Sequence, residues 1–181
     1  MRFLIILILI ITSIQVSAES SRAWWVDFSL EPTKKEILGI SALKIDQRFR
    51  FIEILQCGAE ATLSNYQCSS IEKHGLSLKH HGDFDSNDEK EYWHVAVAKG
   101  HDGGYNKVAL AISSSGEFLF SLTQRVVYPG FSVFFKRNSL LSWAMCMECG
   151  HLADIVWENG SPKLDWGEDY GNPSIKFEAR Q

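Results

Sequence analysis

The sequence predicts an α+β fold that is mainly β, built as an antiparallel meander sheet or a partly closed barrel with one or two short N-terminal helices. From Tyr92 onward, alternating or continuous apolar segments are separated by Gly-containing turns, a pattern typical of antiparallel strands joined by hairpins. Hydrophobic residues make up 45% of the 181 residues, which excludes a disordered or low-complexity chain.

Residues 1–18 have the features of a secretory signal peptide. Arg2 gives a positive start, residues 3–11 are all apolar, and residues 16–18 read Val-Ser-Ala, a small-residue cleavage site. The apolar run is much shorter than the ~20 residues of a membrane-spanning helix. We therefore expect residues 19–181 to form a single exported globular domain, in the periplasm rather than fully secreted.

The first regular elements are predicted to be helical. A helix is expected to begin at Pro32, because Thr33 and Glu36 have the spacing of a capping box, and to end at Gly39. Residues 41–46 are expected to add another turn. Before them, residues 23–30 are predicted to form a short aromatic strand or docking segment.

Most of the remaining chain is predicted to form strands, whereas residues 69–91 are polar. The Asn159-Gly160 pair is typical of a two-residue hairpin turn. The predicted strands are residues 49–54, 92–100, 106–113, 117–127, 131–137, 154–158, 161–166 and 174–179, with residues 139–147 forming either a strand or a short helix.

The four cysteines are expected to form two disulfides, because an exported protein folds in an oxidising compartment. Three pairings are open, and the local one, Cys57 with Cys68 and Cys146 with Cys149, is expected because each pair is close along the chain. A thiol–disulfide active site would need a helix after Cys146, but hairpins are predicted on both sides. A zinc site using His151 would need a second Cys pair.

The acidic segment 83–91 has part of a calcium-loop pattern. Asp83, Asp85 and Asn87 have the 1-3-5 spacing, but the sixth position is not Gly and the twelfth is not Glu. The segment is therefore interpreted as a solvated acidic loop, and neither a metal nor a cofactor is predicted. Clustered like charges steer association with an oppositely charged partner. The candidate partner-binding carboxylates are Asp83, Asp85, Asp88 and Glu89.

Two tryptophans are candidate anchors in an interface. Trp157 and Trp166 lie beside charges or turns, and an exposed aromatic ring buries a large area at low entropic cost. No catalytic motif such as H-E-x-x-H or G-x-S-x-G occurs in the sequence, and the formal charge of −4 does not favour nucleic-acid binding.

These observations predict an exported, non-catalytic module that binds a protein partner. The expected role is that of an inhibitor or immunity protein that neutralises a basic toxin or wall-degrading hydrolase in the bacterial envelope. In size, export and β-content the chain is similar to small exported immunity proteins paired with type VI secretion effectors, and to periplasmic lysozyme inhibitors. Two alternatives remain open: a small-ligand or glycan-binding protein, and a thiol–disulfide protein that uses Cys146 and Cys149.

Overall fold

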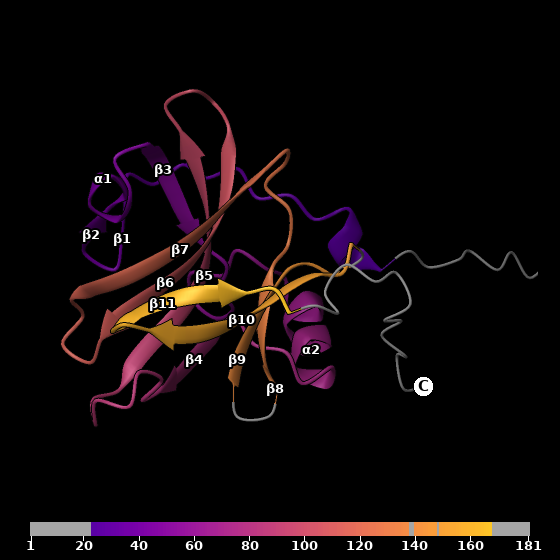
Figure 1. Cartoon of the computed structure of the whole chain (residues 1–181). Coiled ribbons are helices and arrows are strands. Elements are labelled where there is room, and N and C mark those ends of the chain that lie inside the picture. Colours follow the sequence, from indigo (N-terminus) through magenta and orange to yellow (C-terminus); the bar gives the residue numbers. More distant parts are fainter. Residues whose placement is uncertain (1–22, 138–139, 148, 168–181) are drawn as a thin grey trace, which may run out of the picture.

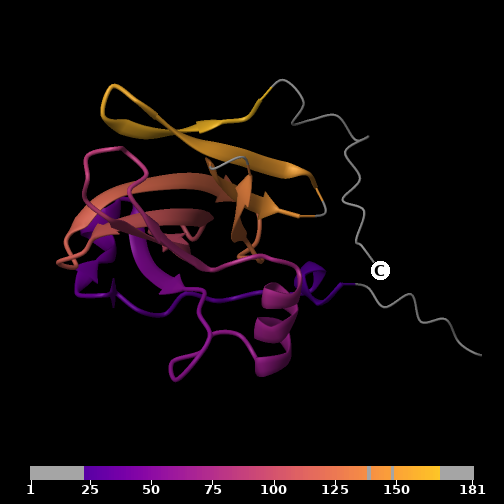
Figure 2. The same ribbon diagram turned by 90° about the horizontal axis from the view of Figure 1, so that it is seen from below.

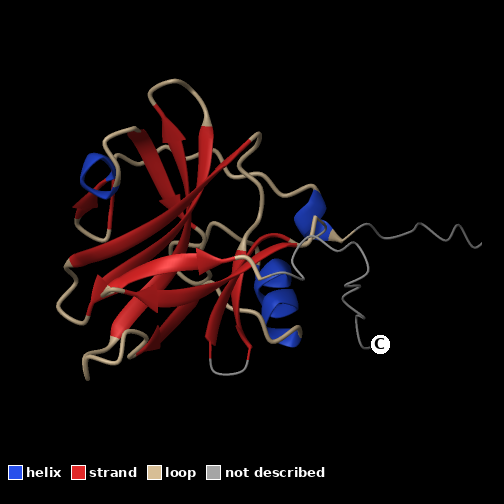
Figure 3. Cartoon of the chain, viewed as in Figure 1, coloured by secondary structure: helices blue, strands red, loops and turns tan. Residues whose placement is uncertain are grey.

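A computed structural model of the chain describes residues 23–137, 140–147 and 149–167 (Figure 1). The predicted signal peptide and the strand predicted at residues 174–179 lie outside the described residues. Strands dominate the described part, and helices are few (Figure 3), so the predicted mainly β fold class is confirmed.

The centre of the fold is a meander of three long strands. These are β5 (Glu91–Gly100), β6 (Tyr105–Ser113) and β7 (Phe118–Val126), and each is antiparallel to the next. The turns between them contain Gly103 and Gly116, whose positive φ angles of 79° and 87° suit glycine. The meander predicted from residue 92 to residue 127 is confirmed.

One edge of this sheet is shared by two strands. β3 (Phe49–Ile54) pairs with the C-terminal half of β5, and β4 (Lys79–Gly82) pairs with its N-terminal half. Between them, residues 55–78 leave the edge and return to it. The backbone of Val95 is satisfied at this junction, because its carbonyl accepts from Leu55 N at 2.9 Å and its N–H donates to the Leu78 carbonyl at 3.1 Å.

The last four strands of the described residues form a second antiparallel sheet instead of extending the first. In the order β11-β10-β9-β8 they are β8 (Val133–Arg137), β9 (Leu140–Cys146), β10 (His151–Glu158) and β11 (Ser161–Asp165). The chain crosses to this sheet after β7, at a segment containing Pro129, which cannot donate to a strand ladder. Both sheets are open within the described residues, so they do not form a closed barrel.

The two sheets and the N-terminal segment form layers around β5 and β6. The β10–β11 hairpin lies over one face of the five-stranded sheet (Figure 2). The core cluster on this side contains the fully buried side chains of Trp93, Trp143 and Phe134. The opposite face packs against β1 (Glu36–Ile37), β2 (Ile40–Ser41) and α1 (Ala42–Ile45). Because β5 and β6 are covered on both faces, their sequences are almost continuously apolar.

The helix predicted from Pro32 to Gly39 is wrong, because these residues lead into the β1–β2 hairpin. Leu38 and Gly39 form its turn, with φ angles of 51° and 74°. The predicted capping residue Thr33 instead donates its hydroxyl to Glu53 at 3.4 Å, and the carbonyl of Lys34 accepts from Ile52 N at 2.8 Å. Pairing with β3 therefore overrides the helix signal. The helical turn predicted at residues 41–46 is confirmed as α1.

Two further differences concern helices. Residues 23–30 contain a 3₁₀ turn, η1 (Trp24–Val26), instead of a strand. The longest helix among the described residues, α2 (Asn65–Lys73), falls in a polar region that was not predicted to be helical, and only Ile71 of its residues is buried. Residues 140–146 form the strand β9, which resolves the strand-or-helix alternative. Among the described residues, no helix is long and apolar enough to cross a membrane.

Candidate functional site

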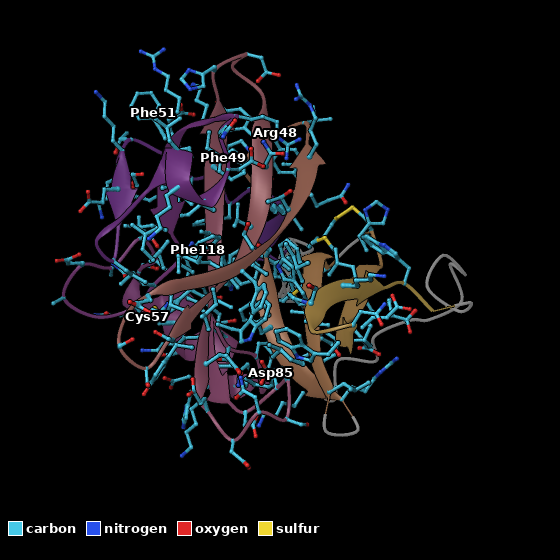
Figure 4. All side chains as sticks on the ribbon, turned by 60° about the vertical axis from the view of Figure 1, so that its left-hand side comes forward. Arg48, Phe49, Phe51, Cys57, Asp85 and Phe118 are labelled. Carbon is cyan, nitrogen blue, oxygen red and sulfur yellow. A yellow bond between two sulfur atoms is a disulfide. The ribbon has the colours of Figure 1, made fainter. Side chains whose placement is uncertain are left out.

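The acidic residues singled out from the sequence lie together in the loop between β4 and β5. This acidic loop, residues 83–90, extends from one end of the five-stranded sheet, where Asp85 is labelled in Figure 4. Asp83, Asp88 and Glu89 are exposed, whereas Asp85 is half-buried. All four predicted carboxylates therefore belong to one continuous structural feature.

Side chains of the acidic loop hold its backbone in place. Asp83 accepts hydrogen bonds from Asn87 N at 3.0 Å and from Asp88 N at 3.1 Å. Asn87 in turn accepts from Glu89 N at 2.7 Å. Ser86 and Asp88 have positive φ angles of 59° and 69°, a conformation that such polar networks support locally. The exposed carboxylates are thus carried on an ordered loop.

Glu91, the first residue of β5, is a buried carboxylate at the base of the acidic loop. Its exposed fraction is 1%, and its Oε2 accepts from Phe84 N at 2.9 Å, while its Oε1 has no hydrogen-bond partner. Burial raises the pKa of Glu91 above its usual value, and the neighbouring Asp85 carboxyl adds to this effect.

Three carboxylates converge at this point. One oxygen each from Asp83, Asp85 and Glu91 lies within 4.8 Å of the others. Within the described part of the chain, no Lys or Arg forms an ion pair with any of the three. Such an arrangement concentrates negative charge and suits a cation, whether an ion or a side chain of another molecule.

A cleft lies beside α2, at the junction where β3 gives way to β4. This cleft has a volume of about 450 Å³ and is lined by the Cys57–Cys68 disulfide, Ile71, Leu38 and His94. Leu38 is 46% exposed, and its backbone has the left-handed conformation of a tight turn. The cleft combines an apolar wall with a few polar groups, as small-ligand sites do.

His94 is a buried titratable group of this α2 cleft, which Glu72 and Lys79 also line. Burial lowers its pKa to about 4, and the positive charge of Lys79 acts in the same direction. The imidazole is therefore neutral at physiological pH and offers a hydrogen-bond donor and acceptor rather than a charge.

The second disulfide lines a smaller cleft of about 260 Å³, together with Lys107 and Tyr128. Lys107 is 4% exposed and donates to the carbonyl of Phe131 at 2.7 Å and to that of Met145. Both disulfides pair locally, as expected from the sequence. The Cys146–Cys149 pair joins the end of β9 to the turn before β10, so it is not at the start of a helix.

The two candidate tryptophans lie far from the acidic loop in the chain, with Trp157 in β10 and Trp166 directly after β11. Trp157 is half-buried, and its ring packs edge-on against Phe120 of β7 with centroids 5.1 Å apart. Trp166 is 38% exposed and meets the His151 ring edge-on at 6.5 Å. Trp157 therefore links the two sheets, whereas Trp166 presents part of its ring to solvent.

Sequence reasoning missed Glu91 and His94. Acidic residues occur at positions 83, 85 and 89, and Glu91 continues this alternate spacing into a strand. The twelve-residue calcium loop places its last carboxylate at the twelfth position, so comparison with that pattern does not identify Glu91. His94 follows in the same strand, and its burial depends on the distant segment 55–78, for which the local sequence gives no signal.

Comparisons of the chain with protein-family models, with curated proteins and with solved structures find no match.

Proposed function

We propose that the protein is exported and acts by binding a basic protein, as an inhibitor or immunity protein that neutralises a toxin or wall-degrading enzyme in the bacterial envelope. The observation that carries this proposal is the acidic loop, in which exposed carboxylates are fixed by the loop's own hydrogen bonds. A pre-ordered loop loses little conformational entropy when a partner binds.

Export is supported by two features. Residues 1–18 have the pattern of a signal peptide, and the described chain contains two disulfides, which persist in oxidising compartments. The periplasm is the compartment that we favour.

A basic partner is supported by the charge of the acidic loop. Asp88 and Glu89 are exposed and take part in no ion pair among the described residues. Their field is therefore available to attract positive charge on another protein and to increase the rate of encounter. Trp166 is a second candidate contact, because its ring is partly exposed.

Affinity capture from the envelope of the source cells tests this function. We expect the wild-type protein to retain one dominant basic protein at low salt, and the Asp88→Asn/Glu89→Gln variant to retain about five-fold less. Asn is chosen at position 88 because it tolerates the positive φ angle found there.

The matched control is Glu36→Gln/Glu60→Gln, which removes the same charge from exposed positions outside the acidic loop. This control should retain the partner as the wild type does. Equal recovery by the loop variant and the wild type, or recovery of no protein by either, would contradict the proposed function.

The α2 cleft supports a second candidate function, the binding of a small ligand or glycan. It is favoured by the neutral His94 beside an apolar wall. NMR shift changes confined to the surroundings of His94 on addition of a ligand would favour this function over protein binding through the acidic loop.

A further inference from the structure

The carboxylate of Glu91 is the unusual group at the base of the acidic loop. It is 1% exposed, and its Oε1 has no hydrogen-bond partner, although buried polar atoms in folded proteins nearly always have one. The group lies against Asp83 and Asp85, with one oxygen from each of the three within 4.8 Å of the others. A buried carboxylate therefore lies against two further carboxylates.

Three carboxylates at this separation repel one another unless positive charge joins them. No Lys or Arg supplies it among the described residues, since none forms an ion pair with Asp83, Asp85 or Glu91. Either a proton held between two of the carboxyls or a bound cation would satisfy the cluster. A cation would also give the buried Glu91 carboxylate a charged partner.

We propose that Asp83, Asp85 and Glu91 bind a calcium ion at the base of the acidic loop. All three supply hard oxygen ligands, which Ca²⁺ prefers. One oxygen from each lies within 4.8 Å of the others, so the three can share one ion. Ca²⁺ accepts irregular oxygen geometry, whereas Mg²⁺ demands a nearly ideal octahedron, so a site made of three carboxylates on a loop and a strand favours Ca²⁺.

The site differs from the twelve-residue calcium loop at the two positions where the sequence pattern fails. Asp88, at the position usually taken by Gly, has a φ angle of 69° and makes the turn that glycine would otherwise allow. Glu91, at the ninth position and on a strand, supplies the third carboxylate in place of a glutamate at the twelfth. Water completes the coordination, as in other sites with few protein ligands.

The proposal does not depend on the proposed partner. Asp88 and Glu89 lie outside the group of three, so their charges remain on the surface when the ion is bound. With three carboxylates, we expect the weak affinity typical of extracellular modules, with a Kd of roughly 10⁻⁴–10⁻³ M.

Isothermal titration calorimetry of the disulfide-bonded protein with CaCl2 tests the site, after chelator treatment and at constant ionic strength. We expect one ion per chain, a rise in Tm with Ca²⁺, and weaker binding of Mg²⁺. Glu91→Gln should weaken Ca²⁺ binding by at least about ten-fold. Glu89→Gln removes the same charge two residues away and should change the affinity by no more than about two-fold.

A second pair of variants serves if Glu91→Gln fails to fold, as judged by near-UV circular dichroism. Asp85→Asn should weaken Ca²⁺ binding, and its matched control Asp88→Asn should not. No calcium binding at 10 mM, equal or tighter binding of Mg²⁺, or equal losses in a variant and its control would overturn the proposal. An absence of calcium binding would indicate that the carboxyls share a proton. Equal losses in a variant and its control would indicate that Ca²⁺ is attracted by the total charge of the loop and not held at one site. Because the assay contains no partner protein, its result is separate from that of the capture experiment.

Discussion

At the scale of single residues, β5 and β6 carry three ionisable side chains in buried positions, and each is accommodated differently. Lys107 donates to the carbonyls of Phe131 and Met145. His94 stays neutral, and Glu91 is left with an oxygen that has no partner. Because unsatisfied buried charge is costly, the Glu91 carboxylate is the group at which an external cation would have the largest effect.

His94 predicts a specific dependence of stability on pH. Its pKa falls from 6.5 to about 4 on folding, so the unfolded chain takes up a proton between these values while the folded chain does not. The resulting stability is complete above pH 6.5 and is lost as the pH falls toward 4. We expect His94 to account for a loss of about 2 kcal/mol between pH 7 and pH 5.

Urea unfolding of wild type and His94→Gln at pH 7 and pH 5 measures this contribution. Between pH 7 and pH 5, the free energy of unfolding of the variant should fall by about 2 kcal/mol less than that of the wild type. His101→Gln, in the exposed turn between β5 and β6, is the control and should follow the wild type. Parallel losses in all three proteins would show that His94 does not carry the effect.

At the scale of elements, two hairpins share the same turn geometry but differ in the first residue of the turn, which is apolar in one and polar in the other. The β1–β2 turn is Leu38-Gly39 with φ angles of 51° and 74°, and the β10–β11 turn is Asn159-Gly160 with 55° and 74°. Asn adopts this conformation readily, whereas a branched apolar side chain does so at a cost of about 1 kcal/mol. Leu38 therefore keeps a strained backbone while it lines the α2 cleft.

Reciprocal substitutions test the strain at these turns. Leu38→Asn should raise the free energy of unfolding by about 1 kcal/mol, and Asn159→Leu should lower it by a similar amount, because the backbone requirement is the same at both sites. Thermal unfolding of both variants checks this. A loss of stability in Leu38→Asn would show that the apolar contacts of Leu38 outweigh the strain.

Elements with strong local patterns could be predicted from the sequence. The meander from β5 to β7 and the Asn159-Gly160 hairpin depend on apolar periodicity and turn residues, which are local. The β1–β2 hairpin could not be predicted, because pairing of Lys34 with Ile52 decides it. The capping box of Ser64 and Gln67 is a local signal for α2 that the sequence prediction did not use, and the helix has too few apolar residues for a periodic pattern.

The candidate site was predictable to a similar extent. The acidic loop is visible as a run of charges, and the structure brings its carboxylates together as one feature. That Glu91 faces the loop while lying at 1% exposure follows from the packing of β5 between layers, which no local pattern reveals. The role of Trp157 between the sheets likewise depends on a contact with Phe120, which is distant in the chain.

At the scale of the whole molecule, the layered architecture gives the acidic loop a firm base. The loop begins and ends on paired strands, and one of them, β5, is buried on both faces. The Cys57–Cys68 disulfide closes the segment that leaves the same sheet edge before β4. A charged loop on such a base can meet a partner without first being ordered, which is the property that the proposed binding function needs.

The most direct test of this account is the association rate of the captured partner, measured by stopped flow over a range of salt concentrations. If the acidic loop steers binding, the rate should fall steeply with salt, and Asp88→Asn/Glu89→Gln should slow it about three- to ten-fold at low salt but little at high salt. The Glu36→Gln/Glu60→Gln control should follow the wild type. Equal rates for the loop variant and the wild type at every salt concentration would contradict the account.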